Sequence, residues 1–221
     1  MELNADFTRR VAVHAAHLPW VPSPVIGIER RMLDRIGAEV ARATSIVRYA
    51  AESRFNAHTH GGGEEFMVLD GVFSDEHGDF PSGSYVRNPP GSTHTPGSQQ
   101  GCTIFVKLRQ FDSEDRTVVR IDTGKLEFLA VPTRPGVHLM PLHADAHEDV
   151  RIERWARDAA IEWVVDGGIE LLVLDGSFEE GGERFTPQSW LRLPPGASLH
   201  ATAGAYGCRV WVKTGHLARL G

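Results

Sequence analysis

The chain has 221 residues, of which 41% are hydrophobic and 24% charged, and its formal net charge is −6. This composition is ordinary for a soluble globular protein, and the negative charge argues against a nonspecific nucleic-acid or anionic-membrane surface. Because the N-terminus is acidic and polar, no apolar run reaches membrane-spanning length and only two cysteines occur, we expect a cytoplasmic protein without a disulfide framework.

Short strand-like segments recur along the whole chain. They are rich in β-branched and aromatic residues, and Gly, Pro and Asp clusters interrupt them about every ten residues. Residues 76–79 are typical of a hairpin loop, and we expect a helical turn within residues 38–44. The spacing predicts an all-β protein of packed antiparallel sheets, as in a jelly roll.

The segment from His58 to Glu64 carries the pattern that most clearly indicates chemistry. Residues i and i+2 of a strand point to the same face, so His58 and His60 can present two imidazoles side by side. Three glycines before Glu64 should let the backbone approach a bound ion, and a rigid Pro-Pro-Gly turn delivers His94. Three imidazoles and one carboxylate suit a first-row divalent metal. Spacing and strand parity favour Glu64 over Glu65 as the carboxylate.

Two classes of metal remain open. A closed tetrahedral shell favours structural or sensory Zn²⁺, whereas an open shell favours Fe²⁺, Mn²⁺ or Ni²⁺ with room for a substrate or dioxygen. Tyr85, Arg87 and Asn88 precede the second turn, and any of them is a candidate hydrogen-bond donor to a metal ligand. Alternation puts Tyr85 and Arg87 on one face, which we expect to be the outer surface.

The motifs around these residues resemble those of the cupin family. H-x-H-x3-E-x6-G runs from His58 to Gly71, and G-x5-P-x-G-x2-H runs from Gly83 to His94. Over residues 44–110 the chain is similar to the cupin domain of ChrR, the bacterial anti-sigma factor family. The resemblance implies one metal ion per chain, with zinc as the first expectation and Fe, Mn or Ni as alternatives, bound by His58, His60, Glu64 and His94.

The second half of the chain repeats the first. A Leu-Asp-Gly sequence at 69–71 recurs at 174–176, and the same offset relates two Pro-Pro-Gly turns. The repeat predicts two tandem cupin (double-stranded β-helix, or jelly-roll) domains, 1–115 and 116–221, rather than one large β-sandwich.

The second domain lacks the ligand set. In the repeat, the positions of His58, His60 and Glu64 are taken by Trp163, Val165 and Ile169. His200 remains near the second turn, but a lone histidine is a poor metal site. We predict that this domain has filled its pocket, and the alternative is an apolar pocket for an organic ligand.

Cys102 and Cys208 occupy equivalent places in the two repeats. A thiol beside the metal would suit an oxidant sensor. Because the copy without a metal site keeps the cysteine, we favour a structural interpretation, in which both are small buried residues.

The ChrR resemblance implies a stress-sensing or transcription-regulatory metal module rather than an enzyme, with an oxidant or a small molecule as its signal. The helical sigma-binding domain of that family, with its H-x3-C-x2-C motif, has no counterpart in this sequence. A sigma factor is therefore suggested by the resemblance alone. The alternative is a metal-dependent cupin dioxygenase or a related small-molecule enzyme, since some dioxygenases that cleave diketones or hydroxyacetophenones are similar. We expect no nucleic-acid or membrane partner, and a homodimer is compatible with the sequence.

Overall fold

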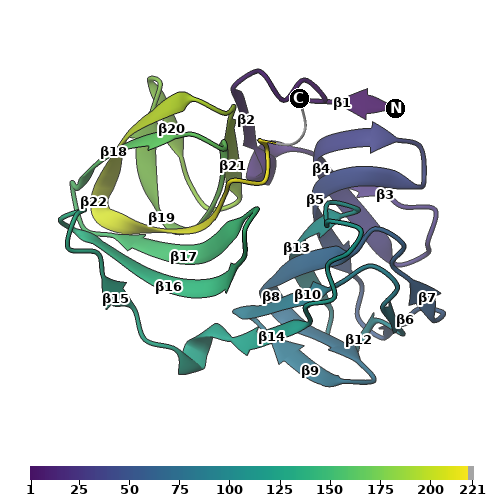
Figure 1. Ribbon diagram of the computed structural model, residues 1–221. Coiled ribbons are helices and arrows are strands. Elements are labelled where there is room, and N and C mark those ends of the chain that lie inside the picture. Colours follow the sequence, from purple (N-terminus) through teal and green to yellow (C-terminus); the bar gives the residue numbers. More distant parts are fainter. Residues whose placement is uncertain (219–221) are drawn as a thin grey trace. The chain divides into compact units, whose positions relative to one another are not determined.

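Almost all regular structure in residues 1–218, the part of the chain that the computed structural model describes, is β-strand (Figure 1). Contacts group the chain into two units. Unit 1 comprises Met1–Ala5 and Leu18–Lys125, and unit 2 comprises Asp6–His17 and the chain from Leu126 onwards. Each unit is built on its own antiparallel sheet, which confirms the predicted all-β fold of two tandem domains.

Unit 1 folds around one large sheet. Its elements are β1 (Glu2–Leu3), β3 (Val21–Pro22), β4 (Ile28–Gly37), β5 (Ala41–Tyr49), β6 (Ser53–Arg54), β7 (His58–Thr59), β8 (Glu64–Asp75), β9 (Gly78–Pro81), β10 (Ser84–Asn88), β11 (Thr93–His94), β12 (Gly97–Ser98), β13 (Cys102–Leu108), β14 (Val119–Asp122) and the 3-10 helix η2 (Thr123–Lys125). The hydrogen-bonded order is β1-β4-β5-β13-β8-β10-β14, and β7 pairs separately with β11. The first half of β8 lies at the centre of this sheet and carries Glu64 at its start.

Unit 2 repeats this plan. Its elements are β2 (Val11–His14), the 3-10 helix η1 (Ala15–His17), β15 (Leu129–Ala130), β16 (Val137–Ala144), β17 (Asp149–Trp155), β18 (Ala160–Val165), β19 (Ile169–Glu180), β20 (Glu183–Phe185), β21 (Ser189–Leu193) and β22 (Ala197–Thr214). The order is β15-β16-β17-β22-β19-β21-β2. Because β2 pairs with β21, residues 6–17 lie with unit 2. The ranges 1–115 and 116–221 predicted from the repeat do not place residues 6–17 with the second domain. The repeat gives no sign of this placement, because β2 and β21 are far apart in the sequence.

A glycine bends the central strand of both units. Gly71 in β8 and Gly176 in β19 each have a φ of +72°. A Cβ at Gly71 would lie 2.1 Å from the carbonyl oxygen of Gly101, and one at Gly176 would lie 2.2 Å from that of Gly207. Only glycine fits this approach. The bend lets one strand pair with the main sheet in its first half and with β9 or β20 in its second.

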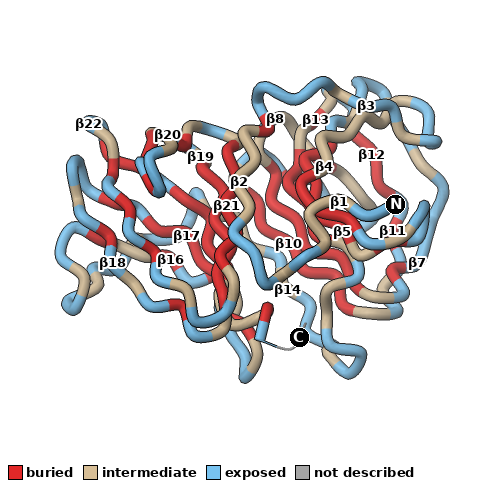
Figure 2. The backbone as a smooth tube through the Cα atoms, turned by 90° about the horizontal axis from the view of Figure 1, so that it is seen from above, coloured by how far each residue is buried: buried red, intermediate tan, exposed pale blue. Residues whose placement is uncertain are grey.

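Each unit encloses its own apolar core. The equivalent strands β10 and β21 are buried along their whole length (Figure 2). The core of unit 1 includes Val47, Phe66, Val68, Phe73, Ile104 and Val106. The core of unit 2 includes Trp155, Ile169, Phe178, Phe185, Leu199 and Val212.

Two local predictions have different outcomes. The hairpin loop predicted at residues 76–79 is confirmed, because β8 and β9 pair across a turn there. The helical turn predicted at residues 38–44 is wrong, because β5 already begins at Ala41 and pairs with β4. The helix propensity of this segment yields to the hydrogen bonds of the β4–β5 hairpin. None of the helices in residues 1–218 has the length and apolar character needed to cross a membrane.

Candidate metal centre

Two short strands bring the histidines of unit 1 together. His58 on β7 is the direct cross-strand partner of His94 on β11. His60 lies just beyond β7, where its N–H donates to the Ser92 carbonyl at 2.9 Å and its carbonyl accepts from the Gly91 N–H at 2.9 Å. The Pro-Pro-Gly turn is thus hydrogen-bonded to the backbone of His60, and it places His94 beside both other imidazoles.

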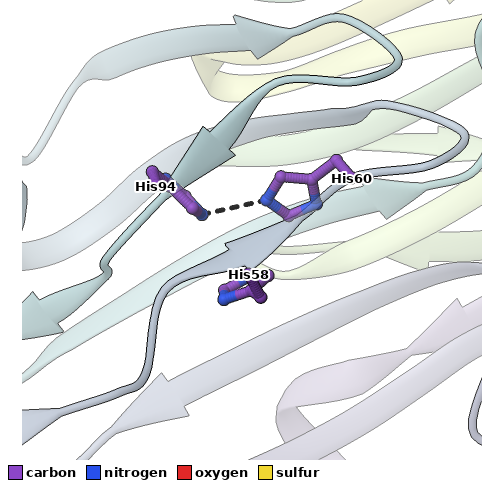
Figure 3. Close-up of side chains that lie close together, drawn as sticks. All are labelled: His58, His60 and His94. Carbon is purple, nitrogen blue, oxygen red and sulfur yellow. Dashed lines mark hydrogen bonds between the residues drawn. The ribbon is translucent and has the colours of Figure 1, made fainter.

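The three imidazoles converge on one point (Figure 3). One ligand atom from each of His58, His60 and His94 lies within 4.8 Å of the others. The Nε2 atoms of His60 and His94 are 2.9 Å apart. Glu64 Oε2 lies 3.3 Å from His60 Nε2 and 3.5 Å from His94 Nε2. Glu65 points to the opposite face and accepts a 2.5 Å hydrogen bond from Tyr85.

These separations fit a metal shell. Ligand atoms about 2.1 Å from one ion are separated by about 3.0 Å at adjacent octahedral positions and by about 3.4 Å in a tetrahedron. The distances among His60, His94 and Glu64 lie close to these values. Two imidazole Nε2 atoms at hydrogen-bond distance from each other can share at most one proton, whereas both can donate lone pairs to one cation. The donor set therefore fits a divalent ion of the first row.

Hydrogen bonds on the outer side of the ligands orient them. His94 Nδ1 lies 3.1 Å from Asp75 Oδ2, and His58 Nδ1 lies 3.2 Å from the Asn56 carbonyl. A proton on each Nδ1 leaves each Nε2 free to bind a metal. Asn88, one of three candidates from the sequence, donates to Glu64 Oε2 at 3.3 Å. Asp75 was not predicted from the sequence, and its only sequence signal is its position at the β8–β9 turn.

The surroundings shift the pKa values of the two buried imidazoles, those of His60 and His94, in opposite directions. Burial, together with the neighbouring histidines, lowers the pKa of His60 despite the attraction of Glu64. Burial also disfavours the charged form of His94, but the hydrogen bond that its ring donates to Asp75 and the nearby carboxylates outweigh it and raise the pKa of that residue. His60 is therefore the more readily available as a neutral ligand, and Asp75 makes His94 the more basic one.

Two expectations about neighbouring residues need revision. A Cβ at Gly62 would lie 2.8 Å from the Cβ of Arg109, so close packing against the end of β13 requires this glycine. The glycine run was expected to let the backbone approach a bound ion, but at Gly62 the packing against Arg109 also requires a glycine. Tyr85 and Arg87 share a face as predicted, but that face is buried rather than exposed, with 0% and 1% of these residues accessible. Arg87 donates to Asp115 at 3.0 Å, so the buried charge is paired.

A cavity of about 550 Å³ reaches the cluster. His58, His60 and Glu64 line it, together with Arg30 and Arg109. Its remaining wall is largely apolar and includes Val25, Ile28, Val40, Val47, Phe55, Ile104, Val106 and Leu108. An ion held by the cluster would thus face a pocket of the size and character of a small-molecule site.

The family model of the ChrR cupin-like domain matches the chain twice, over residues 8–112 and 116–218. The chain belongs to the ChrR cupin-like family. It is a bicupin, and the first of its ChrR-like cupins carries the three-histidine cluster that could hold a metal. No functionally curated protein matches the sequence of this ChrR-like chain.

Solved structures share the fold of this ChrR-like bicupin at low identity. A candidate dioxygenase from Nostoc punctiforme superposes with a TM-score of 0.74 at 13% identity, covering 99% of this chain and 84% of its own. Protein YlbA from Escherichia coli gives 0.71 at 15%, with coverages of 96% and 93%. The bacterial pirin YhhW from Escherichia coli, in complex with nickel(II), gives 0.66 at 12%, with coverages of 93% and 98%. Similarity at this level shows the fold alone.

The second ChrR-like cupin has an apolar interior at the equivalent place. Trp163 is the cross-strand partner of Leu199, as His58 is of His94. Val165, Ile169 and Leu199 are at most 3% exposed and belong to the core, and Trp163 packs against it. His200 is exposed, and its partner is Glu162 rather than Trp163. The prediction that side chains fill this pocket agrees with the packing.

Both cysteines are buried free thiols. Burial raises the pKa of Cys102 to about 11 and that of Cys208 to about 12. Because the thiolate is the reactive form, neither residue suits an oxidant sensor, and the structural interpretation is favoured.

Proposed function

We propose that the first cupin binds one divalent first-row metal ion through His58, His60, Glu64 and His94, and that this ion receives a small organic molecule from the cavity, as in a metal-dependent cupin oxygenase. The observation that carries the proposal is the 550 Å³ cavity, because two histidines and the glutamate of the cluster lie in its wall. An enzyme needs open coordination positions that a ligand can reach. A purely structural ion has no use for such a pocket.

When bound, the ion supplies Lewis-acid or redox chemistry toward an oxygen donor. The residues of the chain do the remaining work. Asp75 and the Asn56 carbonyl hold the Nδ1 protons of His94 and His58, and Asn88 orients the carboxylate of Glu64. The apolar wall excludes water and packs against the body of the ligand. The nickel-bound pirin and the candidate dioxygenase support the proposal, in that related folds are associated with such ions and such chemistry.

A second function is favoured by a different observation. The ChrR cupin-like match extends over both units, which supports a zinc-dependent sensor that signals through loss or modification of a ligand. In that case the ion would be Zn²⁺ in a closed shell, and the partner would be a regulatory protein such as a sigma factor. The two functions differ in whether the ion exchanges a water for an external ligand.

Elemental analysis of the purified protein, followed by oxygen-uptake assays with diketones and hydroxyacetophenones, tests the proposal. The oxygenase proposal predicts about one Fe, Mn or Ni per chain and uptake that His60→Ala abolishes. About one zinc per chain, with no oxygen uptake, would favour the sensor instead, provided that uptake is still absent after reconstitution with Fe²⁺, Mn²⁺ or Ni²⁺. A chain without any bound metal after reconstitution would contradict both.

A further inference from the structure

Arg30 is a basic side chain on the apolar inner face of unit 1. On β4 it is the direct cross-strand partner of Val47, which in turn is the partner of Ile104 on β13. Directly opposed residues in a sheet project to the same face. Val47 and Ile104 belong to the core and line the cavity, so the guanidinium of Arg30 enters the same cavity as His58 and His60.

The hydrogen-bonding capacity of this guanidinium is not filled by the protein. Its Nε–H is buried and has no hydrogen-bond partner among the described residues. The carboxylate of Glu39 is 4.0 Å from Nη1, beyond hydrogen-bond length, and the Glu39 side chain is 68% exposed. A buried N–H without a partner costs free energy, which an acceptor arriving with a ligand would recover.

Other charges make the cavity attractive to anions. Arg35 lies on the same strand outside the lining of the cavity and is 5% exposed, and burial and then the charge of Arg30 lower its pKa. Arg109 also lines the cavity. Against these stand Glu39 and Glu64, so a divalent ion at the cluster would leave the cavity with an excess of positive charge.

We infer that the ligand of this cavity is an organic anion, with an oxygen-donor group for the metal, a short apolar middle and a carboxylate that pairs with Arg30. The inference rests on the proposed function and adds the class of ligand. Glu64 on β8 and Arg30 on β4 are three strands apart, which is about 14 Å along the curved sheet. A long arginine side chain and a ligand of a few carbon atoms together can span that separation. Arginine matches a carboxylate through two parallel hydrogen bonds.

Two matched probes test this assignment on the Co²⁺-loaded full-length protein. The probes are 4,6-dioxoheptanoate and heptane-2,4-dione, which share the metal-chelating diketone and the carbon chain and differ in the carboxylate. Titration of each is followed through the visible absorption of the Co²⁺. Because a charged hydrogen-bonded pair is lost with the neutral probe, the wild type should prefer the acid about ten- to a hundredfold.

Variants of one arginine locate the preference. Arg30→Gln should bring the two dissociation constants together while leaving the affinity for heptane-2,4-dione unchanged, and Arg30→Lys should keep part of the preference. Arg48→Gln is the matched control, because Arg48 lies on the adjoining strand, is 45% exposed and pairs with Glu29 outside the cavity. Co²⁺ content and thermal unfolding establish that each variant is folded.

The outcomes distinguish a failure of the ligand assignment from a failure of the proposed open metal site. If both probes bind wild-type protein equally, the assignment of an anionic ligand is overturned. If Arg30→Gln weakens both alike, the pairing of the carboxylate with Arg30 is overturned. The open metal site stands in both cases. If neither probe changes the Co²⁺ spectrum, the open metal site fails and the ligand assignment fails with it.

Discussion

The two cupins of this chain share a framework and differ in what the framework encloses. The bending glycines Gly71 and Gly176 have the same φ and the same close contact, and the strands pair in the same order. Yet the first interior carries imidazoles and a carboxylate at four positions where the second carries Trp163, Val165, Ile169 and Leu199. Backbone geometry and pocket chemistry are therefore separable properties of the fold.

The second interior has its own buried charge at a different place. Glu153, which is 0% exposed, is the equivalent of Val47 and is held by Arg134 through hydrogen bonds of 2.7 and 2.8 Å. Arg134 and Arg151 both lie over the ring of Trp163, at 4.8 and 4.7 Å from its centroid. Unit 2 thus satisfies its buried charge internally, whereas unit 1 leaves Arg30 and the histidines facing a cavity. A buried polar group therefore indicates a binding site where it faces a cavity and keeps an unfilled hydrogen-bonding position, as Arg30 does.

The largest effect should come from exchanging a pocket residue between the units. Ile169→Glu should lower the free energy of unfolding by about 4 kcal/mol, because it removes a packed side chain and buries a carboxyl without a partner. The matched change Glu64→Ile should cost the metal-free protein less than about 1 kcal/mol, because it removes a charge from a polar cluster. Urea denaturation of both variants measures the difference. Equal losses of stability would mean that the two pockets do not differ in their tolerance of polar and apolar side chains.

The next effect concerns metal affinity. His60→Ala should weaken binding by at least about a hundredfold, because a loss of one ligand from the shell exceeds the effect of losing an outer hydrogen bond. His200→Ala is the control from unit 2 and should leave the affinity and the stoichiometry unchanged. Isothermal titration with Co²⁺ or Zn²⁺ gives both values. Retention of full affinity in His60→Ala would remove this residue from the metal site.

A smaller effect is expected for the residue that positions a ligand. Asp75→Asn should weaken metal binding about tenfold, because the His94 Nδ1 proton loses its charged acceptor at 3.1 Å. Asp79→Asn, which changes an exposed acceptor of Ser74 on the same hairpin, is the matched control. Competition with a chromogenic chelator measures both affinities. Equal affinities in the two variants would show that Asp75 does not support the site.

The smallest effect is a dependence of the stability of unit 2 on pH. Burial opposes ionisation of Glu153, but the hydrogen bond and charge of Arg134 and the charge of Arg151 outweigh it and lower the pKa below the ordinary 4.5. The stabilisation is therefore present above about pH 4.5 and is lost as pH falls through the folded-state value, with a slope of at most about 1.4 kcal/mol per pH unit. Because Glu153→Gln lowers stability at every pH, the readout is the slope of the unfolding free energy against pH. Urea denaturation between pH 5 and 3 should show a flatter slope for the variant than for the wild type. An unchanged slope would assign the acid sensitivity to other groups.

The features that depend on short-range spacing could be predicted from the sequence. Strand alternation put His58 and His60 on one face, the motif spacing selected Glu64 over Glu65, and the repeat indicated two β domains. These inferences rest on strand parity and turn chemistry, which are properties of a few consecutive residues.

The contacts between distant strands could not be predicted in this way, because they are set by the tertiary fold. Asp75 reaches His94 from another hairpin, and Arg30 enters the cavity from β4, which lies three strands from β8 in the sheet. Residues 6–17 join unit 2 through the pairing of β2 with β21, and the face of Tyr85 and Arg87 is buried despite its polar residues. None of these follows from local sequence, because burial and partner choice depend on which surfaces the folded chain brings into contact.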